Sequence, residues 1–286
     1  MRYEENYGMA RTPFVRNIPS DQLYSSPSTE ENLNRLRYVA DNQMFAVVIA
    51  EPGCGKSTLL RKFNDSLSKD KYLLLYLSDS KLTPKWLYKG LLDQLGLEAG
   101  FYRGDAKRLL QKQLEAIHSK EHRKVVCILD EAHLLSRDTL EAFRFLLNSE
   151  FDSESQMALV LSGQPELWST KLRYKRYTAI RKRIDVFCTI NPLDRAETED
   201  YIKANLKYAG CDHEIFTDTA VDEIYKVSNG IPRMINRVCE RCLMYGAQQN
   251  KKLIDDHTIQ FVSQHEFISA GSAPADNDRD ISERGK

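Results

Sequence analysis

This sequence of 286 residues lacks the features of a membrane or secreted protein. No stretch approaches the roughly 18 uninterrupted apolar residues that a membrane-spanning helix needs, and the N-terminus is charged rather than apolar. Six cysteines are scattered along the chain, and the one close pair, Cys239 and Cys242, lies in a helical pattern without a second pair nearby. This favours buried, reduced thiols over a zinc or redox site. We therefore expect a cytoplasmic protein without a membrane contact.

The sequence also lacks an excess of charge of either sign. Lys and Arg together number 41, and so do Asp and Glu. A net charge of zero gives no long-range attraction to nucleic acid, so any affinity for DNA has to come from local patches.

Short apolar runs alternate with segments of helical periodicity in the first two thirds of the chain. The apolar runs lie at residues 45–49, 72–77, 125–129, 157–161 and 186–190. Such runs are typical of buried parallel strands, so we predict an α/β fold with a doubly wound parallel sheet. Ligands of these sheets bind at the carboxyl ends of the strands.

After the last apolar run only helical patterns follow, which predicts a separate all-helical domain. We divide the chain into an N-terminal arm (1–27), an α/β domain (28–193), a helical domain (194–268) and a polar, disordered tail (269–286).

A glycine-rich loop follows the first apolar run and opens a helix. Its glycines allow backbone N–H groups to converge on phosphate oxygens, and the helix N-terminus adds partial positive charge. We expect Lys56 to reach the β- and γ-phosphates of ATP and Ser57 to bind Mg²⁺. Ala50 stands where the strict pattern has glycine, at a strand end where a methyl group can be tolerated. The residues expected at the nucleotide are Glu51, Pro52, Gly53, Cys54, Gly55, Lys56, Ser57 and Thr58.

Two acids, Asp130 and Glu131, end the third apolar run. Carboxylates at the end of a buried strand are costly to desolvate unless a cation compensates them. We expect Asp130 to hold Mg²⁺ and Glu131 to orient and polarise the attacking water. With the next two residues these acids spell DEAH, the box of one helicase class, but such helicases need two tandem lobes and this chain has sheet for one.

Three further segments complete an ordered set of motifs. Ser-Gly-Gln-Pro-Glu follows the fourth apolar run at 162–166, Ile-Arg-Lys-Arg-Ile precedes the fifth at 180–184, and Gly-Ile-Pro-Arg lies in the helical region at 230–233. In this order the chain resembles AAA+ ATPases of the ExeA-like group, which includes transposition regulators of the TnsC, TniB and MuB kind. The resemblance implies an AAA+ P-loop fold whose C-terminal all-helical domain is a lid.

The resemblance also implies roles for residues outside the phosphate loop. Gln164 or Ser162 looks like the first sensor, which contacts the γ-phosphate or the attacking water, and Arg233 looks like the second sensor. Arg183, with Arg181 as the alternative, looks like an arginine finger that completes the site of the adjacent subunit. A finger acting in trans implies a homo-oligomer, either a ring or a helical filament.

Two groups of basic residues are candidates for contact with DNA. The first lies between Lys171 and Arg183, contains no acid, and fits either a DNA backbone contact or, as we favour, a contact between subunits. The second follows the second apolar run, in the region that resembles the channel-facing part of DNA-gripping AAA+ proteins, although a solvated helix face would give the same pattern. Its members are Lys81, Lys85, Lys89, Arg103, Lys107 and Lys112.

Together these features favour an ATP-dependent regulator of DNA transposition. It would assemble on double-stranded DNA through backbone contacts and recruit or activate a DDE-type transposase, with a target-selection adaptor as a further partner. One alternative is a secretion-associated ExeA-like ATPase, a role that normally comes with a membrane segment and an envelope-binding region not found in this sequence. The other is an ATP-switched protein scaffold that does not bind DNA.

Overall fold

The computed structural model describes residues 2–78, 82–98, 103–146 and 155–266. These residues form two compact units. The larger unit comprises residues 16–197 and 231–233, and the smaller comprises 2–15, 198–230 and 234–266. No helix in the described part of the chain is both long and apolar enough to cross a membrane.

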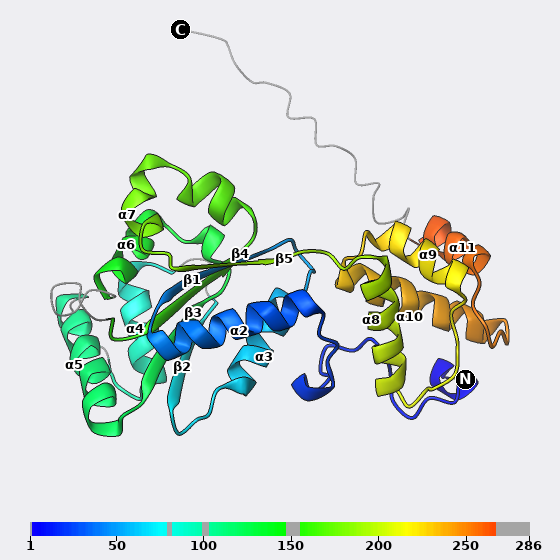
Figure 1. Ribbon diagram of the computed structural model, residues 1–286, viewed down its shortest axis with the longest axis horizontal. Coiled ribbons are helices and arrows are strands. Elements are labelled where there is room, and N and C mark those ends of the chain that lie inside the picture. Colours follow the sequence, from blue (N-terminus) through cyan, green and yellow to red (C-terminus); the bar gives the residue numbers. More distant parts are fainter. Residues whose placement is uncertain (1, 79–81, 99–102, 147–154, 267–286) are drawn as a thin grey trace, which may run out of the picture. The chain divides into compact units, whose positions relative to one another are not determined.

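A five-stranded parallel sheet is the centre of the larger unit (Figure 1). Its strands are β1 (Phe45–Ala50), β2 (Tyr72–Leu77), β3 (Lys124–Leu129), β4 (Ala158–Gly163) and β5 (Val186–Ile190). They lie in the order β2-β3-β4-β1-β5, so the carboxyl ends of β3, β4 and β1 are neighbours at one edge. The predicted parallel α/β sheet is confirmed.

Helices cover both faces of this sheet. α2 (Pro27–Asn42) and α3 (Lys56–Ser66) pack on one face, and α4 (Pro84–Gln94), α5 (Arg103–Glu121) and α6 (Arg137–Leu146) pack on the other. Successive side chains of a strand point to opposite faces, so Val47 of β1 joins one core and Val48 joins the other. Burial on both faces explains why the central strands β1, β3 and β4 are continuous apolar runs rather than alternating ones.

The segment between β4 and β5 contains helical turns that the sequence patterns did not predict. A π-helical segment (Leu167–Leu172) is followed by a 3₁₀ turn (Lys175–Tyr177) and by α7 (Thr178–Arg181). These elements are too short to show helical periodicity in the sequence.

The smaller unit contains only helices, apart from a single β-bridge between Phe216 and Ile254 in its described part. Its helices are α1 (Tyr3–Asn6), most of α8 (Arg195–Tyr208), α9 (Asp218–Ser228), most of α10 (Pro232–Gln248) and α11 (Asp256–Glu266).

The N-terminal residues of the arm pack on this helical unit of the same chain. The Ala10 N–H donates to the Ala209 carbonyl over 2.8 Å, and the Asn6 side-chain amide donates to the Lys251 carbonyl over 3.0 Å. The proposed boundaries near residues 27, 193 and 268 stay predictions, and the tail at 269–286 lies outside the described residues.

Candidate active site

The glycine-rich loop lies between β1 and α3, and its two glycines have left-handed backbone. The φ angle is 93° at Gly53 and 95° at Gly55, values that residues with a Cβ rarely adopt. A Cβ on Gly53 would also lie 3.0 Å from Cβ of Arg233 and 3.1 Å from Cγ2 of Ile231. The Arg233 N–H donates to the Gly53 carbonyl over 3.2 Å. The loop is therefore braced by residues from far along the chain that group with the larger unit.

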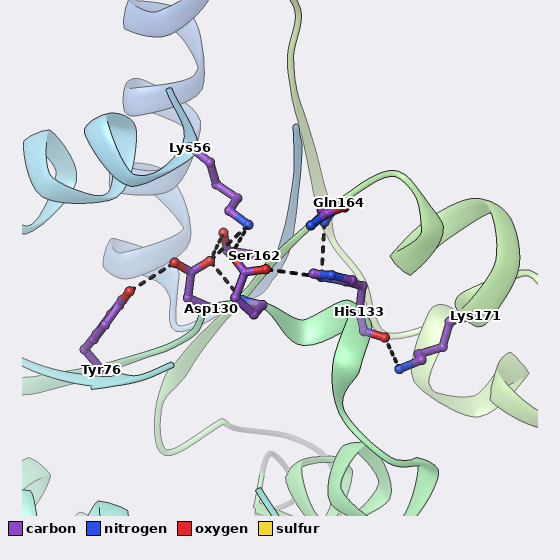
Figure 2. Close-up of polar contacts among 8 residues, drawn as sticks. Lys56, Tyr76, Asp130, His133, Ser162, Gln164 and Lys171 are labelled. Atoms are coloured by element: carbon purple, nitrogen blue, oxygen red, sulfur yellow. Dashed lines mark hydrogen bonds and ion pairs between the residues drawn. The ribbon is translucent and has the colours of Figure 1, made fainter. Parts of the chain in front are cut away.

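Lys56, at the start of α3, lies against both acids at the end of β3 (Figure 2). Its Nζ is 2.8 Å from Oε1 of Glu131 and 3.4 Å from Oδ1 of Asp130. The side chains of Lys56 and Asp130 are only 11% and 6% exposed, so each charge has lost most of its water and needs the other as partner. The structure thus brings together the residues that the sequence assigned to phosphate, metal and water.

Both carboxylate oxygens of Asp130 accept hydrogen bonds. Oδ1 accepts from the Ser162 hydroxyl and from the Glu131 N–H, each over 2.9 Å, and Oδ2 accepts from the Tyr76 hydroxyl over 3.0 Å. Burial, together with the nearby Asp130 charge, raises the pKa of Tyr76 to about 12, so its phenol stays protonated and donates. These bonds fix the orientation of the carboxylate.

Tyr76 is a site residue that the sequence analysis missed. It lies within β2, and in the sequence it is one residue of an apolar run. In the structure β2 pairs with β3, so that Tyr76 is opposite Ile128. Only this pairing brings its hydroxyl to Asp130.

Glu131 begins a tight turn that also places His133 in the site. Glu131 has φ of 52°, which is uncommon for a residue other than glycine, and the 3₁₀ turn Ala132–Leu134 follows. Nδ1 of His133 lies 3.7 Å from Oε2 of Glu131 and faces the Gln164 N–H over 3.5 Å. Burial lowers the pKa of His133, which favours the neutral ring as acceptor of the Gln164 N–H. The contact with Glu131 is then not an ion pair.

These features fit a nucleoside triphosphate with Mg²⁺. The left-handed glycines keep the loop free of side chains where phosphate would approach, and the loop leads directly into the N-terminus of α3. A Ser57 hydroxyl and an Asp130 carboxylate are the hard oxygen donors that Mg²⁺ prefers.

Comparison with known protein families agrees with this chemistry. Residues 39–170 match the AAA domain family. This segment of the chain is similar to AAA domains and contains the glycine-rich loop, Asp130 and Glu131. Solved structures confirm the fold, among them Cdc6p from Pyrobaculum aerophilum, with a TM-score of 0.66 and 17% identity over 88% of this chain and 69% of that chain. Drosophila ORC bound to DNA has a TM-score of 0.64 and 18% identity over 92% of this chain and 65% of that chain. Identities this low show the fold alone.

A curated relative is similar in sequence as well as in fold class. General secretion pathway protein A of Aeromonas hydrophila is 31% identical over 247 residues, which are 85% of this chain. The chain spans only 44% of the length of that protein. This similarity supports an AAA+ ATPase of the ExeA-like group, while the similarity to transposition regulators stays a prediction.

The two candidates for the first sensor, Ser162 and Gln164, differ in their hydrogen bonds. Ser162 donates its hydroxyl hydrogen to Asp130, so it acts on the carboxylate. Gln164 follows the end of β4 and lies beside His133 (Figure 2). Which of the two residues is the first sensor stays a prediction.

The two arginines that are alternatives for the predicted arginine finger lie just before β5. Arg181 ends α7, and its guanidinium donates to the Arg173 carbonyl over 3.3 Å. Arg183 follows two residues later and is partly buried. Arg181 is half-buried as well, and the choice of Arg183 over Arg181 as the finger stays a prediction.

The predicted DNA contacts are only partly described by the structure. Lys85 and Lys89 are exposed on α4, Lys112 is exposed on α5, and Lys107 is half-buried there. Lys81 and the side chain of Arg103 lie outside the described residues. Trp86, which the sequence analysis did not single out, is 55% exposed and lies under Lys89, whose Nζ is 4.9 Å from the ring centroid.

Proposed function

We propose that the chain is a switch driven by ATP binding and hydrolysis at the glycine-rich loop. The observation that carries the proposal is the contact of Lys56 with both Asp130 and Glu131 directly beside that loop. The loop residues Glu51–Thr58 would bind the phosphates through the Lys56 ammonium and through backbone N–H groups, which every residue of the loop except Pro52 has, with Arg233 as the second sensor. Ser57 and Asp130 would hold Mg²⁺, which offsets the negative charge of the phosphates when bound.

Glu131 is proposed to prepare the attacking water. Its Oε1 accepts from Lys56, and phosphate oxygens compete for that ammonium, so triphosphate binding would leave the carboxylate available to water. The carboxylate would then accept a proton from the water as its oxygen attacks the γ-phosphorus, while the bond from that phosphorus to the bridging oxygen breaks and ADP leaves with that oxygen. Gln164 would orient the same water or the γ-phosphate, and Arg183 of an adjacent copy would stabilise the developing charge.

The proposed target is double-stranded DNA, in the service of transposition. ATP would promote assembly of a ring or filament on DNA, and hydrolysis would promote its release, after recruitment or activation of a DDE-type transposase. Support comes from the order of the motifs, from the exposed lysines beside Trp86, and from the fold that the chain shares with an ORC structure bound to DNA. Contacts made by lysines to the phosphate backbone would not depend on base sequence.

A second candidate is a role in secretion, and one observation favours it. The curated relative at 31% identity is a general secretion pathway protein. The sequence analysis counted the lack of a membrane segment against this role. That argument does not exclude the role, because the chain spans only 44% of that protein. A scaffold that binds only other proteins is the third outcome that an experiment has to distinguish.

Binding of a fluorescent random-sequence duplex separates these functions. Anisotropy would be measured with ATP and Mg²⁺, with ADP, and without nucleotide, over a salt series, on the natural chain and on Glu131→Gln. We expect Glu131→Gln to bind ATP, to hydrolyse it at least about 100-fold more slowly, and to stay on DNA. Its ATP-bound DNA affinity should fall steeply with salt. Absence of binding in every nucleotide state would reject the DNA proposal and favour secretion or a scaffold.

A further inference from the structure

Lys171 does not belong to the exposed basic surface with which the sequence grouped it. Its Nζ donates to the backbone carbonyls of His133 and of Leu135, the latter over 2.5 Å, and Figure 2 shows the side chain reaching the His133 oxygen. Burial is the larger cause that lowers the pKa of Lys171, and the nearby Arg176 charge lowers it further. Arg173, Lys175 and Arg176, which follow in sequence, are exposed.

The two carbonyls belong to the turn that begins at Glu131. The left-handed backbone of Glu131 is unfavourable for a residue with a Cβ and persists only where the surroundings hold it. At the start of the turn the Glu131 N–H is bound by Asp130, and at its end the carbonyls of His133 and Leu135 are bound by Lys171. The direction of the Glu131 side chain depends on this backbone.

The other side of the contact is a segment anchored by buried side chains. Lys171 lies in the π-helical segment Leu167–Leu172, and both of its terminal leucines are fully buried. Single π-helical turns often occur at functional sites, because the wider turn redirects a side chain. The Tyr174 N–H donates to the Lys171 carbonyl over 3.3 Å, and short helical turns then continue to Arg183.

We propose that Lys171 is a positioning residue for ATP hydrolysis. It fixes the turn that aims Glu131 at water, and it ties that turn to the segment leading to Arg183. Contact between Arg183 and the nucleotide of a neighbouring subunit would therefore affect the Glu131 turn of the chain that contains this Arg183. The proposal rests on the proposed role of Glu131.

The test compares Lys171→Met with Lys62→Met. Lys62 is a matched control, because burial lowers its pKa as well, but it lies on α3, 3.8 Å from Glu30, away from the Glu131 turn. We expect Lys171→Met to lower kcat by about 10- to 100-fold while KM and ATP affinity change less than about twofold. Lys171→Arg should restore most of kcat, since a guanidinium can donate to both carbonyls. Lys62→Met should keep kcat.

Three results would overturn the proposal: an undiminished kcat in Lys171→Met, a parallel loss of ATP affinity and melting temperature, or no recovery in Lys171→Arg. Glu131→Gln, measured alongside, separates the two proposals. If that variant is inactive and Lys171→Met is fully active, only the role of Lys171 fails. If Glu131→Gln hydrolyses ATP normally, the proposed catalytic role of Glu131 fails.

Discussion

At the scale of single residues, two lysines of the larger unit are shielded from solvent and contact different kinds of partner. Lys56 lies between carboxylates, and phosphate oxygens can compete with these for the ammonium. Lys171 is bound by carbonyls of the backbone, which are fixed dipoles that no substrate replaces. The first arrangement suits a binding residue, and the second suits one that holds structure around the site.

The role of Lys56 gives a prediction at this scale. Lys56→Ala removes the cation that faces the phosphates and leaves Asp130 and Glu131 without their ammonium, so two negative charges would repel the triphosphate. We expect ATP affinity to fall by at least about 100-fold, measured by calorimetric titration. Lys69→Ala, at an exposed position, is the control and should bind ATP normally. Normal affinity in Lys56→Ala would place the nucleotide elsewhere.

At the scale of elements, side-chain caps fix where helices of the smaller unit begin. The Thr217 hydroxyl accepts from the Ala220 N–H over 3.1 Å at the start of α9. Asp255 precedes α11, and its Oδ1 accepts from the Thr258 N–H over 2.9 Å and from the Thr258 hydroxyl over 2.6 Å. Such caps satisfy N–H groups that have no partner within the helix.

The Asp255 cap predicts a pH-dependent contribution to stability. Its hydrogen bonds from Thr258 lower the pKa of Asp255, so the charged carboxylate stabilises the fold above its unfolded pKa of about 3.9, and this contribution is lost as the pH falls through the lower, folded value. Asp255→Ala should destabilise the chain by about 1 kcal/mol at pH 7. The difference in melting temperature from the natural chain should shrink below about pH 4.

Asp212→Ala is the control for this series, because Asp212 is exposed. It should melt like the natural chain at pH 7. If the difference in melting temperature between Asp255→Ala and the natural chain stays constant down to pH 3, the charge of Asp255 does not stabilise α11.

At the scale of the whole molecule, the proposed finger makes hydrolysis a property of the assembly. Arg183 lies in a segment attached through Lys171 to its own Glu131 turn, but it would act on the nucleotide of a neighbour. Each subunit would then both supply a finger and receive one.

Assemblies that contain two different variants test whether each subunit supplies a finger to its neighbour. Arg183→Ala alone and Lys56→Ala alone should each lose most ATPase activity. Mixed together, they should regain part of it, since intact sites of Arg183→Ala subunits would receive Arg183 from Lys56→Ala neighbours. Turnover across a range of mixing ratios is the measurement. A mixture no more active than its separate components would argue against a finger in trans.

The local sequence determined the strands, the loop and the acids. The runs that became β1, β3 and β4 are apolar throughout because both of their faces are buried, and the glycines and acids at the run ends met once the strands were parallel. Periodicity and turn chemistry act over a few residues, which is why the elements and the loop could be predicted from their own sequence.

Only the tertiary structure decided the partners of these residues. Tyr76 reached Asp130 because β2 pairs with β3, and Arg233 braced Gly53 from far along the chain. Lys171 turned inward because carbonyls of the Glu131 turn were within reach, although the basic residues that follow it, Arg173, Lys175 and Arg176, are exposed. Such contacts depend on the order of strands and the path of the chain between them, and a pattern that repeats over a few residues carries no information about either.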